Sequence, residues 1–133
     1  MSDYKYYLDN GIYDIQDGKF KDAIEKIDKS IELKNDFEIS YFYRAVANQA
    51  LKNFDEAMLD YTKALKINPK MTDAYYNMAE IILTRKDIIH PNLPKAVEYL
   101  NKALEYLEKL LQIEPQAVNA RALKKLILNK YIL

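Results

Sequence analysis

The stretch EISYFYRAVANQALKNFDEAMLDYTKALKINPKM, residues 38–71, decides the fold of this chain. Its large and small apolar residues repeat those of the preceding stretch at a spacing of 34 residues. The matched pairs are Tyr7 with Tyr41, Gly11 with Ala45, Phe20 with Phe54, Ala23 with Ala57, and Ile27 with Tyr61. Tyr75 and Ala79 continue the first two columns by the same step. A repeat this short cannot bury its apolar face alone, so the sequence predicts stacked copies that share one core.

The composition favours a single helical domain. A chain of 133 residues can bury a core of ordinary size, and only two glycines and four prolines interrupt it. Twenty basic residues balance twenty acidic ones, which argues against a nucleic-acid partner. No apolar run approaches the roughly 18 residues that a membrane span needs, and the first residues do not resemble a signal peptide. The chain has no cysteine, which excludes disulfides and suits a reducing compartment. We therefore expect a cytoplasmic protein without a membrane partner.

Apolar periodicity and turn residues predict seven helices. They are expected at residues 4–16, 20–33, about 37–51, 55–67, from Thr72 or Asp73 to about 85, from Pro94 to before Glu114-Pro115, and from 116 to about 130. Gly18 supplies the first turn, Asn35-Asp36 is a plausible cap, and Pro69 cannot continue a helix. In the last helix we expect one apolar face to be buried and the basic residues to face water. The buried set is Val118, Ala122, Leu123, Leu126 and Ile127, and the basic set is Arg121, Lys124, Lys125 and Lys130.

These residues resemble the tetratricopeptide repeat family, whose signature places aromatic and small residues at fixed positions before a closing proline. The middle repeat carries Tyr41, Ala45, Ala57, Tyr61 and Pro69 at these positions. The first repeat has Tyr7, Gly11, Ala23 and Ile27, with Asn35 in place of the proline. The third repeat has Tyr75, Met78, Ala79 and Ile82. The resemblance implies an all-α, right-handed α-solenoid of three helix pairs plus a C-terminal capping helix. We expect one repeat domain over residues 1–133, with repeats at about 4–37, 38–71 and 72–115 and the capping helix at about 116–131.

The third repeat departs from the pattern in two places. Its inter-helix loop, Asp87 to Leu93, is longer than its counterparts and contains His90-Pro91. Its second helix carries a two-heptad apolar seam, formed by Val97, Leu100, Leu104, Leu107 and Leu111 and widened by Ala96, Ala103 and Leu110. That seam packs either on the neighbouring helices or against a second copy of the chain. The apolar tail, residues 131–133, likewise docks either on its own cap or in a neighbouring groove.

Polar residues also replace the leucine and tyrosine that the family places inside each first helix. The replacements are Asn10 and Asp14, then Arg44 and Asn48. Because the corresponding helices should lie side by side, Asp14 and Arg44 either meet between them or both reach solvent.

In the family the first helices line a concave surface where ligands typically lie. Carried over to this sequence, that surface holds a candidate partner-binding groove, formed by Leu8, Ile12, Phe42, Tyr43, Val46, Tyr76, Asn77 and Glu80. Apolar residues placed on an open face are typical of a contact site. The groove receives either a peptide or helix of a partner protein or the chain's own loop or C-terminal helix. Asp9, Asp73 and Glu80 make its rim mildly acidic.

Chaperone-binding members of the family clamp a C-terminal carboxylate with basic and amide side chains. The matching positions here are Leu8, Ile12, Tyr43, Asp73 and Asn77. None of them is basic, so we expect no binding of acidic chaperone tails.

Catalytic chemistry is not expected. The chain has one histidine, no cysteine and no glycine-rich phosphate loop, and it suggests no metal site and no cofactor. The sequence therefore predicts a non-enzymatic adaptor that binds a partner protein or peptide. The alternative is a self-associating scaffold, a homodimer for example, joined through the long sixth helix or the tail.

Overall fold

The computed structural model describes residues 3–85 and 94–129 of the chain. All of its described elements are helices: α1 (Tyr4–Gln16), α2 (Phe20–Leu33), α3 (Glu38–Ala50), α4 (Phe54–Ile67), α5 (Thr72–Thr84), α6 (Pro94–Ile113) and α7 (Val118–Ile127). The predicted helices are confirmed, with ends that move by no more than three residues. The long loop at residues 87–93 and the tail at residues 131–133 lie outside the described residues.

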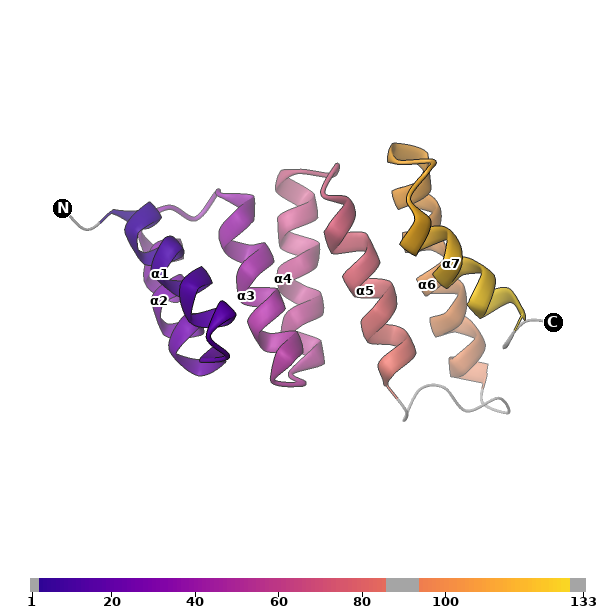
Figure 1. Cartoon of the computed structure of the whole chain (residues 1–133), viewed down its shortest axis with the longest axis horizontal. Helices are drawn as coiled ribbons and strands as arrows, with labels where there is room; N and C mark the ends of the chain where they lie inside the picture. The colour runs from indigo at the N-terminus through magenta and orange to yellow at the C-terminus, as the bar shows by residue number, and fades with distance from the viewer. Residues whose placement is uncertain (1–2, 86–93, 130–133) are drawn as a thin grey trace. The chain divides into compact units, whose positions relative to one another are not determined.

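The helices fall into two compact units. Unit 1, Met1–Pro69, contains α1 to α4, and unit 2, Lys70–Leu133, contains α5 to α7. In unit 1, each helix packs on the next in the chain, and α1 also touches α3 (Figure 1). In unit 2, α6 packs on both α5 and α7. A single domain over the whole chain stays a prediction.

The two hairpin turns of unit 1 share one backbone geometry. Gly18 has φ +77° and Lys52, 34 residues later, has φ +64°, so both residues are left-handed. In both turns the amide of this residue donates to the carbonyl three residues earlier at 3.0 Å. The next amide donates to the carbonyl five residues earlier at 2.8 Å. This pairing closes a helix end and favours glycine at the left-handed position, so Lys52 occupies a site that suits glycine better.

The packing of α1 on α2 requires a glycine. A Cβ atom on Gly11 would lie 2.6 Å from Cγ1 of Ile27 and 3.3 Å from the carbonyl oxygen of Ala23. The equivalent position in the next hairpin is Ala45, which is buried opposite Tyr61. Because tyrosine is not branched at Cβ, it leaves more room near the backbone than isoleucine does. Gly11 with Ile27 and Ala45 with Tyr61 are thus two solutions to the same helix contact.

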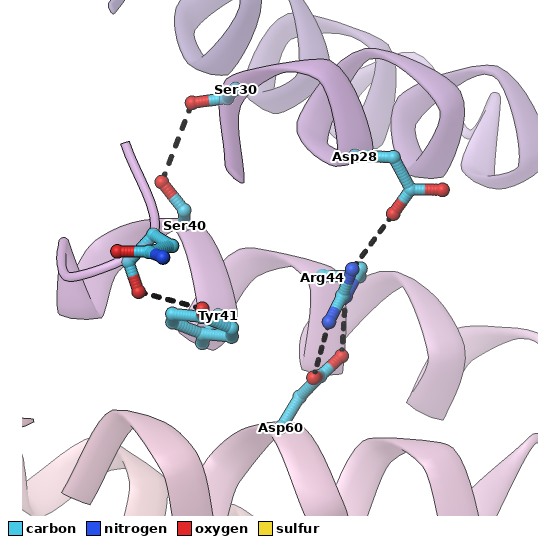
Figure 2. A network of polar contacts seen from close by, with 7 residues as sticks. Asp28, Ser30, Ser40, Tyr41, Arg44 and Asp60 are labelled. Atoms are coloured by element: carbon cyan, nitrogen blue, oxygen red, sulfur yellow. Dashed lines mark hydrogen bonds and ion pairs between the residues drawn. The ribbon is translucent and has the colours of Figure 1, made fainter. Parts of the chain in front are cut away.

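An ion network fixes α3 between α2 and α4. Arg44 Nε and Nη2 donate to the two carboxylate oxygens of Asp60 on α4 at 2.8 and 2.9 Å. Arg44 Nη1 donates to Asp28 Oδ1 on α2 at 2.8 Å (Figure 2). These carboxylates raise the pKa of the guanidinium, the Asp60 hydrogen bond contributing most. Both interpretations of Asp14 and Arg44 are wrong, because the two side chains do not pair and Asp14, which is buried, is bonded to Lys26 Nζ of α2 at 2.5 Å.

Further polar contacts hold α3 onto α2 and the turn between them. The Ser30 hydroxyl of α2 donates to the Tyr4 carbonyl at 2.7 Å and lies 3.4 Å from the Ser40 hydroxyl of α3. Figure 2 shows the two serine hydroxyls facing each other, and both serines are buried. The Tyr41 hydroxyl donates to the Asn35 carbonyl at 2.7 Å. Asn35, where the family has proline, therefore accepts a bond that anchors the start of α3.

In unit 2 the apolar seam of α6 faces its own unit. Leu100, Ala103, Leu107 and Leu110 are buried, at spacings of three and four residues. Leu104 and Leu111 are half-buried and Val97 is half exposed. The buried face of α6 is therefore rotated about the helix axis, toward Ala103 and Leu110, relative to the predicted seam. Thr72, at the start of α5, donates from its hydroxyl to Glu114 Oε1 beyond the end of α6 at 2.8 Å. The seam therefore packs on the neighbouring helices of unit 2, which was the first of the two interpretations, and not against a second copy of the chain.

The face that α7 buries differs from the prediction. Ala120 and Ile127 are buried, whereas Val118 is 79% and Leu126 is 52% exposed. Ala122 is exposed too. The helix is rotated so that the small side chain of Ala120 meets α6, which allows a close approach. Arg121 and Lys125 are exposed as expected, while Lys124 is half-buried and ion-paired with Glu108 of α6.

The predicted cap at Asn35-Asp36 is wrong, and α5, which begins at Thr72 as predicted, has no side-chain cap either. The residues at the N-cap positions of α3 and α5 are Phe37 and Met71, and neither makes a side-chain capping bond. Asp36 pairs instead with Lys34 at 3.0 Å. Thr72 lies inside the first turn, where its hydroxyl is used by Glu114. Asp36 is thus paired within the turn between α2 and α3, and Thr72 with a residue just beyond α6.

Candidate functional site

The predicted groove residues lie on the first helix of each hairpin. Leu8 and Ile12 belong to α1, Phe42, Tyr43 and Val46 to α3, and Tyr76, Asn77 and Glu80 to α5. The first five lie in unit 1, on the helices α1 and α3, which are in contact. The last three lie in unit 2. Within unit 1, the five residues form the surface that we call the α1–α3 face.

The members of the α1–α3 face differ in exposure. Ile12, Phe42, Tyr43 and Val46 are half-buried, so each offers part of its side chain to a ligand. Leu8 is only 4% exposed. It therefore supports the face from below and contributes little contact surface, which corrects its assignment as an open groove residue.

Aromatic packing holds the α1–α3 face in place. The rings of Phe42 and Tyr43 meet edge to face at a centroid distance of 5.3 Å. Phe42 also packs on Tyr61 of α4 at 5.6 Å. The Tyr61 hydroxyl, on a fully buried side chain, donates to Gln49 Oε1 at 2.6 Å. Phe42 is thus part of the α3–α4 packing as well as of the surface, whereas the ring of Tyr43 packs on Phe42 of the same helix. Rigid aromatic side chains lose little entropy on binding.

The α5 residues form a smaller, more polar face in unit 2. Tyr76 and Asn77 are half-buried and Glu80 is exposed. Burial raises the pKa of the Tyr76 hydroxyl, and the negative charge of Glu80 raises it further. The phenol therefore stays protonated at neutral pH and keeps a hydrogen-bond donor beside a carboxylate acceptor.

The positions of the carboxylate clamp carry no positive charge. Leu8 is buried, Ile12 and Tyr43 are half-buried apolar or aromatic groups, and Asp73 is exposed on α5. A carboxylate ligand would meet no ammonium or guanidinium at these five positions, and it would meet the negative charge of Asp73. The chemistry of these positions suits an apolar ligand segment.

The exposed face of α7 is a surface that the sequence did not predict. Apolar periodicity alone assigned Val118, Ala122 and Leu126 to the core, yet all three face outward. The signal that could have found them is Ala120, since a small residue on the opposite side of a helix favours close packing there.

Clusters of metal-ligating side chains are absent from the described part of the chain. Among residues 3–85 and 94–129, no three His, Asp or Glu side chains gather as metal ligands would. No helix within these ranges is long and apolar enough to cross a membrane.

The sequence is similar to known repeat proteins. Residues 39–71 match the family model described as Tetratricopeptide repeat. TPR repeat-containing protein MJ1428 of Methanocaldococcus jannaschii is 37% identical over 93 residues, which cover 65% of this chain and 15% of that protein. Human Tetratricopeptide repeat protein 12 is 31% identical over 71 residues, covering 53% of this chain and 10% of that protein. The chain therefore matches only a small part of the length of these relatives.

Solved structures show the same fold at low sequence identity. The first TPR of Spaghetti (RPAP3), bound to the HSP90 peptide SRMEEVD, has a TM-score of 0.82 at 22% identity and covers 98% of this chain and 94% of its own. The Arabidopsis OM64 TPR domain has a TM-score of 0.78 at 21% identity, with 95% and 94% covered. MamA has a TM-score of 0.80 at 22% identity, with 95% and 67% covered. The predicted all-α helical repeat solenoid is confirmed, and residues 39–71 of the chain are a tetratricopeptide repeat.

Proposed function

We propose that this chain is a non-enzymatic protein-interaction module that holds a peptide or helix of a partner protein on the faces of its first helices. The observation that carries the proposal is the α1–α3 face. Ile12, Phe42, Tyr43 and Val46 are only half-buried, although their apolar character would suit a core. Such a surface, rigid and apolar, is typical of a groove that takes side-chain anchors from a peptide.

Similar structures support peptide binding as the general mode. The first TPR of Spaghetti (RPAP3) holds the HSP90 peptide SRMEEVD, and the second TPR domain of human RPAP3 holds the HSP70 peptide SGPTIEEVD. This chain differs in the side chains that a ligand would meet. With no basic group at the clamp positions, it should reject acidic C-terminal tails and select segments with bulky apolar anchors. Tyr76, Asn77 and Glu80 on α5 would add polar contacts and a preference for basic ligand residues.

Self-association through the α6 seam finds no support. Leu100 and Leu107 of the seam are buried within unit 2, so they are not available to a second copy. The cytoplasmic location stays a prediction, which the lack of cysteine favours.

The test is selection of phage-displayed random peptides on the immobilised chain. We expect enriched peptides to share apolar anchors and to lose binding to the variants Ile12→Ser and Val46→Ser. The matched control is Tyr13→Ser, because Tyr13 is exposed on α1 but is not part of the face. The synthetic peptide SRMEEVD is a second control and should not bind.

The proposal predicts that circular dichroism spectra of the folded variants match the wild type. If selection enriches no common motif, or if the selected peptides bind Ile12→Ser and Val46→Ser as tightly as the wild type, the α1–α3 face is not the binding site. Micromolar binding of SRMEEVD would refute the ligand class.

A further inference from the structure

The outward face of α7 combines an apolar stripe with a basic row. Val118, Ala122 and Leu126 are exposed and follow one another at four-residue spacing, so they lie along one side of the helix. Arg121 and Lys125, also four residues apart, run beside this stripe and are exposed. From Val118 to Leu126 the stripe rises through eight residue steps, about 12 Å along the helix. Isolated exposed apolar residues are common on proteins, whereas an ordered row of them marks a contact surface.

Hollows lie on both sides of the basic row. One, of about 390 Å³, is lined by Val118, Arg121, Ala122 and Lys125. The other, of about 400 Å³, lies between α6 and α7 and has Leu111, Pro115 and Leu128 among its lining residues. Arg121 and Lys125 line both hollows. Volumes of this size accept bulky side chains of a bound segment and not a whole helix.

The charge of this surface is one-sided. From Pro115 to Asn129 the chain contains Arg121, Lys124 and Lys125 and no acidic residue. Lys124 is neutralised by Glu108. The Arg121 guanidinium donates to the neutral amide oxygen of Gln116 at 3.3 Å, which leaves its charge uncompensated. Among the described residues Lys125 has no acidic side chain in ion-pair range, so this row has a net positive charge of about two.

We propose that the outward face of α7 is a second binding surface, which takes an acidic amphipathic helix from a partner protein. The ligand's apolar stripe would cover Val118, Ala122 and Leu126, and glutamates or aspartates beside that stripe would meet Arg121 and Lys125. Helices pack through apolar residues at spacings of three and four, which the α7 stripe matches. A symmetric contact with a second copy would place the same basic row against itself, because a two-fold interface pairs identical surfaces. Complementary charge therefore favours a different, acidic partner.

The test uses a fluorescein-labelled synthetic helical peptide with leucines at i, i+4 and i+8 and glutamates on both sides of them. Binding to the full chain is measured by fluorescence anisotropy at low and high salt. We expect the peptide to bind about tenfold tighter than a peptide of the same composition in which the leucines are shuffled off one face. The affinity should fall as salt rises, because exposed charges are screened.

Variants locate the site. Arg121→Glu/Lys125→Glu should weaken binding by about tenfold or more, and Val118→Ser should weaken it without changing its salt dependence. Lys102→Glu is the matched control, since Lys102 is exposed on α6 and lines neither hollow. Ile12→Ser, which alters the α1–α3 face, should leave this affinity unchanged and so separates the two surfaces.

Four results would overturn the proposal. Equal binding of the striped and shuffled peptides would reduce the interaction to non-specific attraction of charge. Unchanged binding by Arg121→Glu/Lys125→Glu, or an affinity that does not depend on salt, would place the ligand elsewhere. Concentration-dependent self-association in sedimentation, abolished by Val118→Ser, would show that a second copy covers this face.

Discussion

Replacement of Arg44 by methionine should destabilise the protein more than any other single change in its polar contacts. The guanidinium makes two bonds to Asp60, whose side chain is 11% exposed, and one to Asp28, which is 48% exposed. Hydrogen bonds to charged groups contribute about 1.5–3 kcal/mol each, and an uncompensated buried carboxylate adds a desolvation penalty. Discounted for the partial exposure of Arg44, the expected loss is about 2–4 kcal/mol.

The assay is urea unfolding followed by circular dichroism at neutral pH. Against a typical total stability of about 5–15 kcal/mol, a loss of this size gives a clear shift of the midpoint. Asp28→Asn is the matched control and should cost only about 0.5 kcal/mol, because that carboxylate is half exposed. In the double variant Arg44→Met/Asp60→Leu most of the loss should be recovered, since the only carboxylate left without its arginine is Asp28, which is half exposed. A loss below about 0.5 kcal/mol in Arg44→Met, or equal losses in Arg44→Met and Asp28→Asn, would refute the reasoning.

Four further variants test the repeat geometry and one ion pair. Gly11→Ala should lower the free energy of unfolding by about 1–3 kcal/mol, measured by urea unfolding, because the added Cβ would overlap Ile27. Unchanged stability would show that α1 can shift to make room. Lys52→Gly should stabilise by about 0.5–1 kcal/mol and Gly18→Ala should destabilise by a similar amount, as thermal melting will show, since both sites are left-handed. Lys26→Met tests pH dependence, because the hydrogen bond to Asp14 raises the pKa of Lys26 above 10.5. The extra stability of the wild type over Lys26→Met should be constant from neutral pH to about 10.5 and shrink as the pH rises through the raised pKa of Lys26. A stability difference that grows there would contradict the assigned pair.

The helix boundaries could be predicted because local chemistry sets them. Gly18 ends one hairpin turn, Pro69 follows the end of α4, and a 3.6-residue period fills the segments between. The rotation of each helix about its axis could not be predicted in the same way, because it depends on which neighbouring helix packs against it. In α7 the apolar residues occupy more than half of the circumference, so periodicity alone could not choose between the Val118 side and the Ala120 side.

The partners of polar side chains were equally hard to predict. The 34-residue columns put Asp14 and Arg44 on adjacent helices, yet each found its partner on another helix. Long side chains such as those of lysine and arginine reach several neighbours, and the sequence does not specify which of these is chosen. The positions of the α1–α3 face were easier, since the repeat itself places them on the first helices.

Stability and binding should be separable on α3. Its packing positions have taken up polar residues, and no buried side-chain nitrogen or oxygen in the described residues lacks a partner. Arg44 therefore holds α3 through charge, while Val46 and Tyr43 remain half-buried on the α1–α3 face. We expect Val46→Ser to lose peptide binding at a cost of about 1 kcal/mol in stability, well below the loss in Arg44→Met. Urea midpoints and peptide affinities measured on both variants decide the matter: if Val46→Ser is as unstable as Arg44→Met, Val46 belongs to the core and the α1–α3 face is not a binding surface.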